Sequence, residues 1–188
     1  AGVTGIAAQA NRPATTDGVV ASPTEVGGCD VFPATNYWNT PVAGLPAHTS
    51  SQAWLDAIGG TLLHPDFGGP SYGIPITVTT KKARTKVRFD YADESDHRRY
   101  PLRSSTRIEA GSDRHAVVVD RKRCRLYETW NTRRTASGWR AGSGAVWNLR
   151  SNALRPAGWT SADAAGLPIL PGLLRWSEVR SGRVDHAI

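Results

Sequence analysis

The sequence predicts an all-β or β-dominated α+β fold, most simply an antiparallel sandwich or barrel with two or three short helices and long loops. The chain of 188 residues carries 19 Gly and 12 Pro, which divide it into short segments. Several segments alternate between apolar and polar residues or are rich in β-branched residues, as strands are. Few stretches have helical spacing. At this length, a single domain is the expectation.

The two ends of the chain differ in composition. Residues 1–26 are small, polar and poor in bulky apolar groups, so we expect a flexible N-terminal arm. Residues 27–188 are expected to form a single β-rich domain. The arm resembles the new N-terminus of a processed export product, although it contains no signal peptide. No stretch approaches the roughly 18 apolar residues of a membrane span. We therefore expect a secreted, extracellular protein with no membrane partner.

Three segments have helical features. Residues 49–60 combine serines at the start, an apolar face and a Gly-Gly stop. Shorter helices are expected in 160–166 and in 172–182, where apolar residues recur at helical spacing.

Five segments predict strands. The segment that begins at residue 72 contains Pro75, which favours an edge or early-strand position. The clearest alternation is in KVRFDY, and the run AVVVDRKRCRLYETW has the pattern of a hairpin around a polar turn. The strand candidates are 72–80, 86–91, the two arms of 116–130, 144–149 and 184–188.

The hairpin carries two polar residues where apolar ones belong. With a turn centred between Arg121 and Lys122, antiparallel pairing places His115 opposite Glu128, on a face whose other members are apolar. Asp113 and Trp130 would continue the same row.

A buried glutamate is costly unless it is paired, and a histidine is a natural partner. The pair could act as general acid and base or as two metal ligands. The alternatives are a structural ion pair that closes the sheet, or a register slip that places both groups in solvent.

Two further segments supply candidate catalytic residues. His64 lies in the Gly- and Pro-bounded loop LHPDFGG, where functional side chains are often presented. Asp96 belongs to the acidic stretch FDYADESDH, whose spacing differs from a calcium-binding loop. Simple turn chemistry and a solvated acidic loop are the respective alternatives.

A metal site is a separate hypothesis. His186 shares an apolar face of its predicted strand, and together with His64 and His115 it could bind a divalent metal. The sequence contains no HExxH, GxSxG, P-loop or dinucleotide motif, so no cofactor is indicated.

The two cysteines allow a single pairing. Cys29 lies at the entry to the domain and Cys124 lies in the hairpin. A disulfide would connect the N-terminal region to a core strand, whereas the alternative is two buried free thiols. The export-like start favours the disulfide.

The formal net charge of +7 suits an anionic partner such as an acidic polysaccharide or cell wall. Basic residues do not gather in one block, and no recognition motif for nucleic acid is present, so specific nucleic-acid binding is not expected.

Long phrases of the chain resemble a family of uncharacterised secreted proteins from high-GC soil bacteria. The phrases are CDVFPATNYWNTPV, HPDFGG, YADESD, DRHAVVVDRKRCRLYE, GSGAVWNLRSNALRPAGWTSADAAGLPILPGLLRW and GRVDHAI, within residues 29–188. The resemblance implies secretion but no catalytic residue. Because family members continue beyond GRVDHAI, it also implies that these residues are the N-terminal part of a longer or processed product, with its C-terminal chain as a partner.

Three functions are compatible with these features. The first is a secreted enzyme that acts on an extracellular polymer, a polysaccharide above all, by general acid–base chemistry as a glycoside hydrolase or a lyase. The second is a noncatalytic carbohydrate-binding or inhibitor-like protein that uses its tryptophans. The third is a metal-binding protein that uses its histidines.

Overall fold

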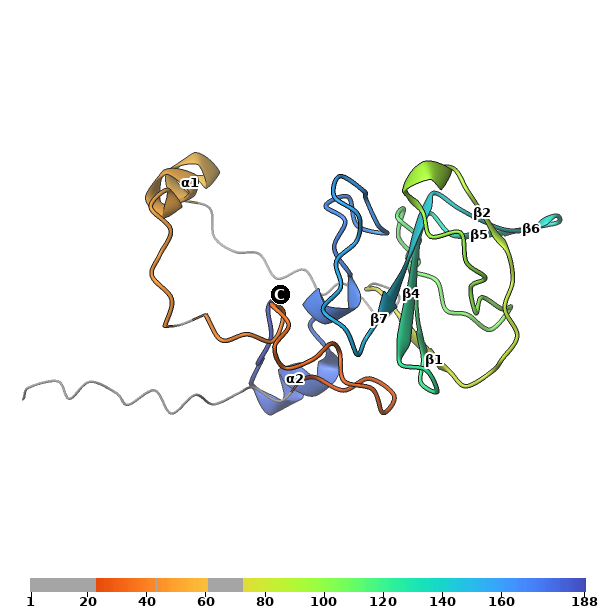
Figure 1. Cartoon of the computed structure of the whole chain (residues 1–188), viewed down its shortest axis with the longest axis horizontal. Helices are drawn as coiled ribbons and strands as arrows, with labels where there is room; N and C mark the ends of the chain where they lie inside the picture. Colours follow the sequence, from red (N-terminus) through yellow and green to blue (C-terminus); the bar gives the residue numbers. More distant parts are fainter. Residues whose placement is uncertain (1–22, 43, 61–72) are drawn as a thin grey trace, which may run out of the picture.

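The structure is a computed structural model, and it describes residues 23–42, 44–60 and 73–188. It contains two sheets (Figure 1). The larger sheet has the strand order β1 (Ile76–Thr79), β3 (Ala116–Asp120), β4 (Arg125–Trp130), β7 (Ser143–Asn148). The smaller sheet has the order β2 (Val87–Phe89), β6 (Gly138–Ala141), β5 (Arg133–Thr135). The helical elements are α1 (Ser51–Ile58), η1 (Ala92–Glu94), η2 (Leu170–Gly172) and α2 (Trp176–Ser181).

The predicted β-dominated α+β class is confirmed, but the sheets are mixed instead of purely antiparallel. β1 pairs with β3 in parallel, and β2 pairs with β6 in parallel. A parallel pair needs a crossover of a dozen or more residues, and the long connections after β1 and β2 provide it. The described residues form no closed barrel. Within them, no helix is both long and apolar enough to cross a membrane.

The strand predictions succeed where apolar residues dominate. The predicted strand at 184–188 is wrong, because these residues have no strand partner and only the Ala187 N–H donates to the Trp38 carbonyl. Sequence reasoning missed β5, whose three residues are all polar and exposed, and β6, a four-residue strand in which buried Trp139 and Ala141 alternate with two exposed residues.

The helix predictions succeed in part. The predicted helix at 49–60 is α1, and the one at 172–182 shortens to α2. The predicted helix at 160–166 is wrong. Its Asp163 carboxylate accepts the N–H groups of Ala165 and Leu167, which folds the segment into turns instead.

The larger sheet separates two apolar clusters. All five residues of β3 are buried, because both faces of this strand are covered. One face carries Val117, Val119, Leu126, Ala145 and Trp147, which we call the first core. The other face carries Ala116, Val118 and Tyr127 and packs on Tyr100, Leu102 and Trp139.

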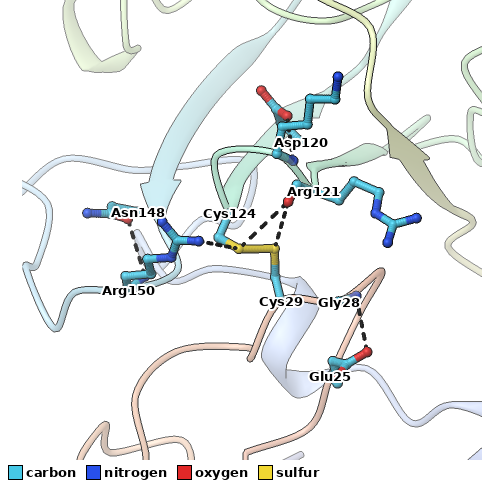
Figure 2. Close-up of a disulfide and its surroundings, with 9 residues drawn as sticks. Glu25, Gly28, Cys29, Asp120, Arg121, Cys124, Asn148 and Arg150 are labelled. Carbon is cyan, nitrogen blue, oxygen red and sulfur yellow. Dashed lines mark hydrogen bonds between the residues drawn. A yellow bond between two sulfur atoms is a disulfide. The ribbon is translucent and has the colours of Figure 1, made fainter.

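The disulfide prediction is confirmed. Cys29 and Cys124 form a disulfide that connects the N-terminal segment to the turn before β4 (Figure 2). The Arg121 carbonyl oxygen lies 3.5 Å from the Cys29 sulfur and 3.9 Å from the Cys124 sulfur. The neighbouring Val26 is already buried in the first core, so packing begins before residue 27.

Candidate functional site

A cavity of about 840 Å³ opens at the end of the first core, within the size range of small-molecule sites. Strand ends form one wall, and the segment 160–173 forms the opposite wall. The residues that line it are Trp38, Ile74, Tyr91, Glu94, Asp113, His115, Trp130, Ser143, Thr160, Ser161, Ala162, Asp163, Ala164, Leu167, Pro168, Ile169, Gly172 and Leu173.

Strand register places His115 in this wall. Ala116 pairs with Thr129, so His115 and Trp130 come next on the two strands, and Trp130 pairs in turn with Ser143. Residues two apart share a face of a sheet, so this row continues the face of the first core. The first core therefore ends at the row formed by His115, Trp130 and Ser143, which lines the cavity.

The backbone changes direction beside both His115 and Trp130. Arg114, which precedes His115, has a φ of 49°, and Asn131, which follows Trp130, has a φ of 52°. The Thr132 N–H donates to the Arg114 carbonyl across this bend. Left-handed non-glycine residues are strained, and such strain gathers at functional sites.

A carboxylate outside the cavity wall holds the His115 ring. Nδ1 lies 2.7 Å from Oε2 of Glu109, and the same oxygen accepts the His115 backbone N–H at 3.0 Å. Nε2 lies 3.2 Å from the carbonyl oxygen of Ala162. A neutral imidazole has one N–H, so only the imidazolium can donate to both oxygens. Both ring nitrogens therefore lie against protein oxygens, Nδ1 on Glu109 and Nε2 on Ala162.

Glu128 does not pair with His115, so the predicted hairpin register is wrong. The strands pair Glu128 with Val117, because the turn is two residues longer than assumed and includes Cys124 at a φ of 45°. Both side chains still share one face. However, Glu128 is fully buried one row inside the core, whereas His115 lines the cavity.

Glu128 instead supports the opposite wall of the cavity. Its two carboxylate oxygens accept the N–H groups of Ile169 and Leu170 at 2.9 and 2.8 Å. Burial raises the pKa of this carboxyl group to about 7, although the two amide donors act in the other direction. The group connects β4 to the segment that covers the cavity.

Further hydrogen bonds shape the covering segment. The buried Ser143 hydroxyl donates to the Ser161 carbonyl at 2.5 Å, which joins β7 to the segment. The Ser161 hydroxyl donates to the Leu167 carbonyl at 2.6 Å and accepts the Asp163 N–H. These contacts fix the wall opposite His115.

Carboxylates bring negative charge into the cavity. Glu94 accepts the N–H and the hydroxyl of Thr160 on one oxygen, and these hydrogen bonds lower its pKa. Asp113 is exposed and accepts the Trp130 indole N–H at 3.4 Å. Both groups are therefore available as bases or as partners for polar substrate groups.

Aromatic rings form one side of the opening. Tyr91 and Trp130 have ring centroids 6.2 Å apart at an interplanar angle of 35°. A Cβ at Gly142 would lie 2.2 Å from the Trp130 ring, so only glycine allows the indole to lie there. Trp38 contributes a third ring to the lining.

Asp96 lies outside this lining. Its carboxylate accepts the Val146 N–H at 2.8 Å and pairs with Arg155 at 2.6 Å. The Arg155 guanidinium also lies over the rings of Trp147 and Trp159. Asp96 therefore connects the loop after η1 to β7.

The histidines of the metal hypothesis are engaged separately. His64 lies outside the described residues. His115 contacts Glu109, whereas Nε2 of His186 lies 2.8 Å from Oε1 of Glu178. Across residues 23–42, 44–60 and 73–188, no group of three or more His, Cys, Asp or Glu side chains could hold a metal ion.

Sequence reasoning drew attention to His115, Asp113 and Trp130 and to the acidic stretch that contains Glu94. It selected Asp96 from that stretch and missed Glu109. Glu109 lies in an irregular segment six residues before His115, and its N–H donates to the His115 carbonyl in addition to the two contacts of its carboxylate. Comparisons with protein-family models, curated proteins and solved structures find no match for this chain.

Proposed function

We propose that the protein is a secreted enzyme that binds an acidic polysaccharide in the cavity beside His115 and cleaves it by general acid–base chemistry. One observation carries this proposal: a histidine oriented by Glu109 lines a cavity that also presents aromatic rings and carboxylates. The Cys29–Cys124 disulfide supports an extracellular location, because disulfides persist in oxidising compartments.

The lining suits a sugar. Aromatic rings pack against the apolar faces of sugar rings, and polar groups at the edge bind their hydroxyls. Tyr91 and Trp130 would supply the stacking surface, and Glu94 would accept hydroxyl hydrogen bonds.

We assign the proton donor to His115. Its Nε2–H would leave the Ala162 carbonyl and protonate the leaving oxygen of the glycosidic bond, while Glu109 holds Nδ1 in position. Asp113, two residues earlier and exposed to the same cavity, would remove a proton from the attacking water. Hydrolysis fits better than elimination, because it needs a proton donor and a base for water, whereas elimination needs a cation beside the uronate and, among the described residues, the lining contains no lysine or arginine.

An arginine row favours an acidic polymer. The register pairs Arg88 with Arg140 and Arg140 with Arg133, so three exposed guanidinium groups cross the smaller sheet. Asp90 pairs with Arg140 at 2.5 Å. Like charges opposite one another destabilise a sheet, so an anionic partner would relieve this repulsion.

This arginine row is close to the cavity along the chain. Arg88 precedes Tyr91 by three residues, and Arg133 follows Trp130 by three. A polymer that places one sugar in the cavity would therefore place neighbouring acidic sugars near the row.

Degradation assays test the proposal. Purified protein is incubated with polygalacturonate, alginate, hyaluronan and neutral glucans, and new reducing ends are measured. We expect cleavage of an acidic polymer, with loss of turnover in His115→Ala and loss of binding in Trp130→Ala. Arg99→Ala, at an exposed arginine outside the row and the cavity, is the control. Equal turnover by wild type and His115→Ala would contradict the assigned role.

One observation favours a second function, carbohydrate binding without cleavage. Both ring nitrogens of His115 already face protein oxygens, as in a structural histidine. In that case His115→Ala would leave binding of the same polymers intact and no wild-type turnover would be detected, whereas Trp130→Ala would still abolish binding.

A further inference from the structure

A second, smaller hollow of about 220 Å³ lies along the edge strand β1, away from His115. It is formed between the end of β1 and the segment 101–106. The residues that line it are Thr77, Val78, Thr79, Thr80, Lys81, Pro101, Arg103, Ser105 and Thr106. This lining contains two basic residues, five hydroxyl side chains and no carboxylate.

Three of the hydroxyl groups are arranged as donors. The oxygen of Thr77 accepts the Arg107 N–H, that of Thr79 accepts the Lys81 N–H, and that of Thr106 accepts the Arg103 N–H. A hydroxyl that already accepts a backbone N–H keeps its own proton for another acceptor. The backbone contacts therefore leave three O–H groups to donate.

The two basic side chains lack acidic partners. Within the described part of the chain, neither Lys81 nor Arg103 forms a side-chain ion pair. The Arg103 Nε is buried and has no hydrogen-bond acceptor among the described residues. By contrast, the nearby Arg84 pairs with the buried Asp120. A buried donor without an acceptor is costly, and an acceptor bound in the hollow beside this guanidinium would lower that cost.

We propose that this hollow binds a tetrahedral oxyanion, a phosphate or sulfate group. Such a group carries several acceptor oxygens, matching three hydroxyl donors and two cations, and charge-assisted hydrogen bonds to Arg and Lys are strong. The ligand is either the free ion or the same group esterified to a sugar. The proposal is independent of cleavage at His115, because the two linings share no residue.

Titrations followed by NMR test this site in the full chain. Inorganic phosphate, sulfate, acetate, glucose 6-phosphate and a sulfated disaccharide are added at constant ionic strength. We expect saturable shifts of the amides of Thr77, Thr79, Arg103 and Thr106 with phosphate or sulfate, and weaker effects with acetate. Tighter binding of an ester than of the free ion would identify the ester as the ligand source.

Matched variants distinguish a site from general attraction. Lys81→Ala and Arg103→Ala should each weaken binding at least about tenfold, the loss of one charge-assisted hydrogen bond. Lys82→Ala and Arg107→Ala remove neighbouring exposed charges outside the hollow. Each should change the affinity for the oxyanion less than about twofold. Lys81 is exposed, so its variant remains informative if Arg103→Ala fails to fold. Absence of saturation, or equal losses in all four variants, would overturn the proposal.

Discussion

Replacement of Glu128 by glutamine should remove a pH dependence of stability that the buried carboxyl group creates. The pKa of Glu128 is about 7 in the folded protein, against an ordinary value of 4.5. Below pH 4.5 the group is neutral in both states, so its contribution to stability is fully present. As pH rises toward 7, the unfolded chain ionises first, and stability falls until the folded group ionises as well.

The size of the effect follows from these values. Each pKa unit corresponds to about 1.4 kcal/mol, so the limiting loss is about 3 kcal/mol, most of it between pH 5 and pH 8. In a protein of this size such a loss lowers Tm by roughly 5–10 °C. Glu128→Gln has nearly the same shape but cannot ionise. Its free energy of unfolding should therefore lack this component.

Urea denaturation at pH 5 and pH 8 measures the effect. The difference between wild type and Glu128→Gln should shift by about 2–3 kcal/mol in favour of the variant at pH 8. Asp93→Asn, which neutralises an exposed carboxylate, controls for the loss of one charge. Parallel stability curves for wild type and Glu128→Gln would refute the reasoning. A shift in the opposite direction would mean that the amide donors outweigh burial.

Three other changes should have measurable effects. Replacing Cys29 and Cys124 together by serine should lower the free energy of unfolding by about 4 kcal/mol in chemical denaturation, because the disulfide spans 95 residues; reducing agent should then affect only the wild type. Gly142→Ala should displace the Trp130 ring, cost about 1–3 kcal/mol and weaken binding of the polymer, as measured by calorimetry; unchanged binding would contradict the role of that ring. Arg155→Ala should cost about 1–3 kcal/mol in thermal unfolding, because it removes a buried guanidinium and leaves part-buried acceptors without their donor.

The fold class could be predicted because it depends on local patterns. The runs around Val117 and Leu126 are apolar enough to be strands in any register. The two cysteines allow only one pairing, and the export-like start favours a disulfide over free thiols. The parallel partners could not be predicted, since nothing local to Thr77 specifies that it lies beside Val118. Strand order depends on the path of the long connections, which have no local pattern.

The candidate site could be predicted only in part. A histidine and a glutamate in an apolar hairpin drew attention to the correct end of the sheet. Whether His115 and Glu128 lie opposite one another depends on the length of the turn. A shift of two residues in the strand pairing keeps both side chains on one face but gives each of them a different cross-strand neighbour. Glu109 reaches His115 from an irregular segment without periodicity, so no pattern indicated it.

The two polar residues of the hairpin, His115 and Glu128, contribute to facing walls of the cavity. His115 lies in the cavity wall, while Glu128, one row deeper, holds the N–H groups of Ile169 and Leu170 in the wall that faces it. Ionisation of Glu128 costs stability because of its burial, yet its carboxyl oxygens are what attach the covering segment to β4. The same residue therefore connects the stability of the core to the shape of the cavity. A substitution that removes this pH dependence, such as Glu128→Gln, replaces one of the two acceptors with an N–H₂ donor, so it should loosen one wall of the site.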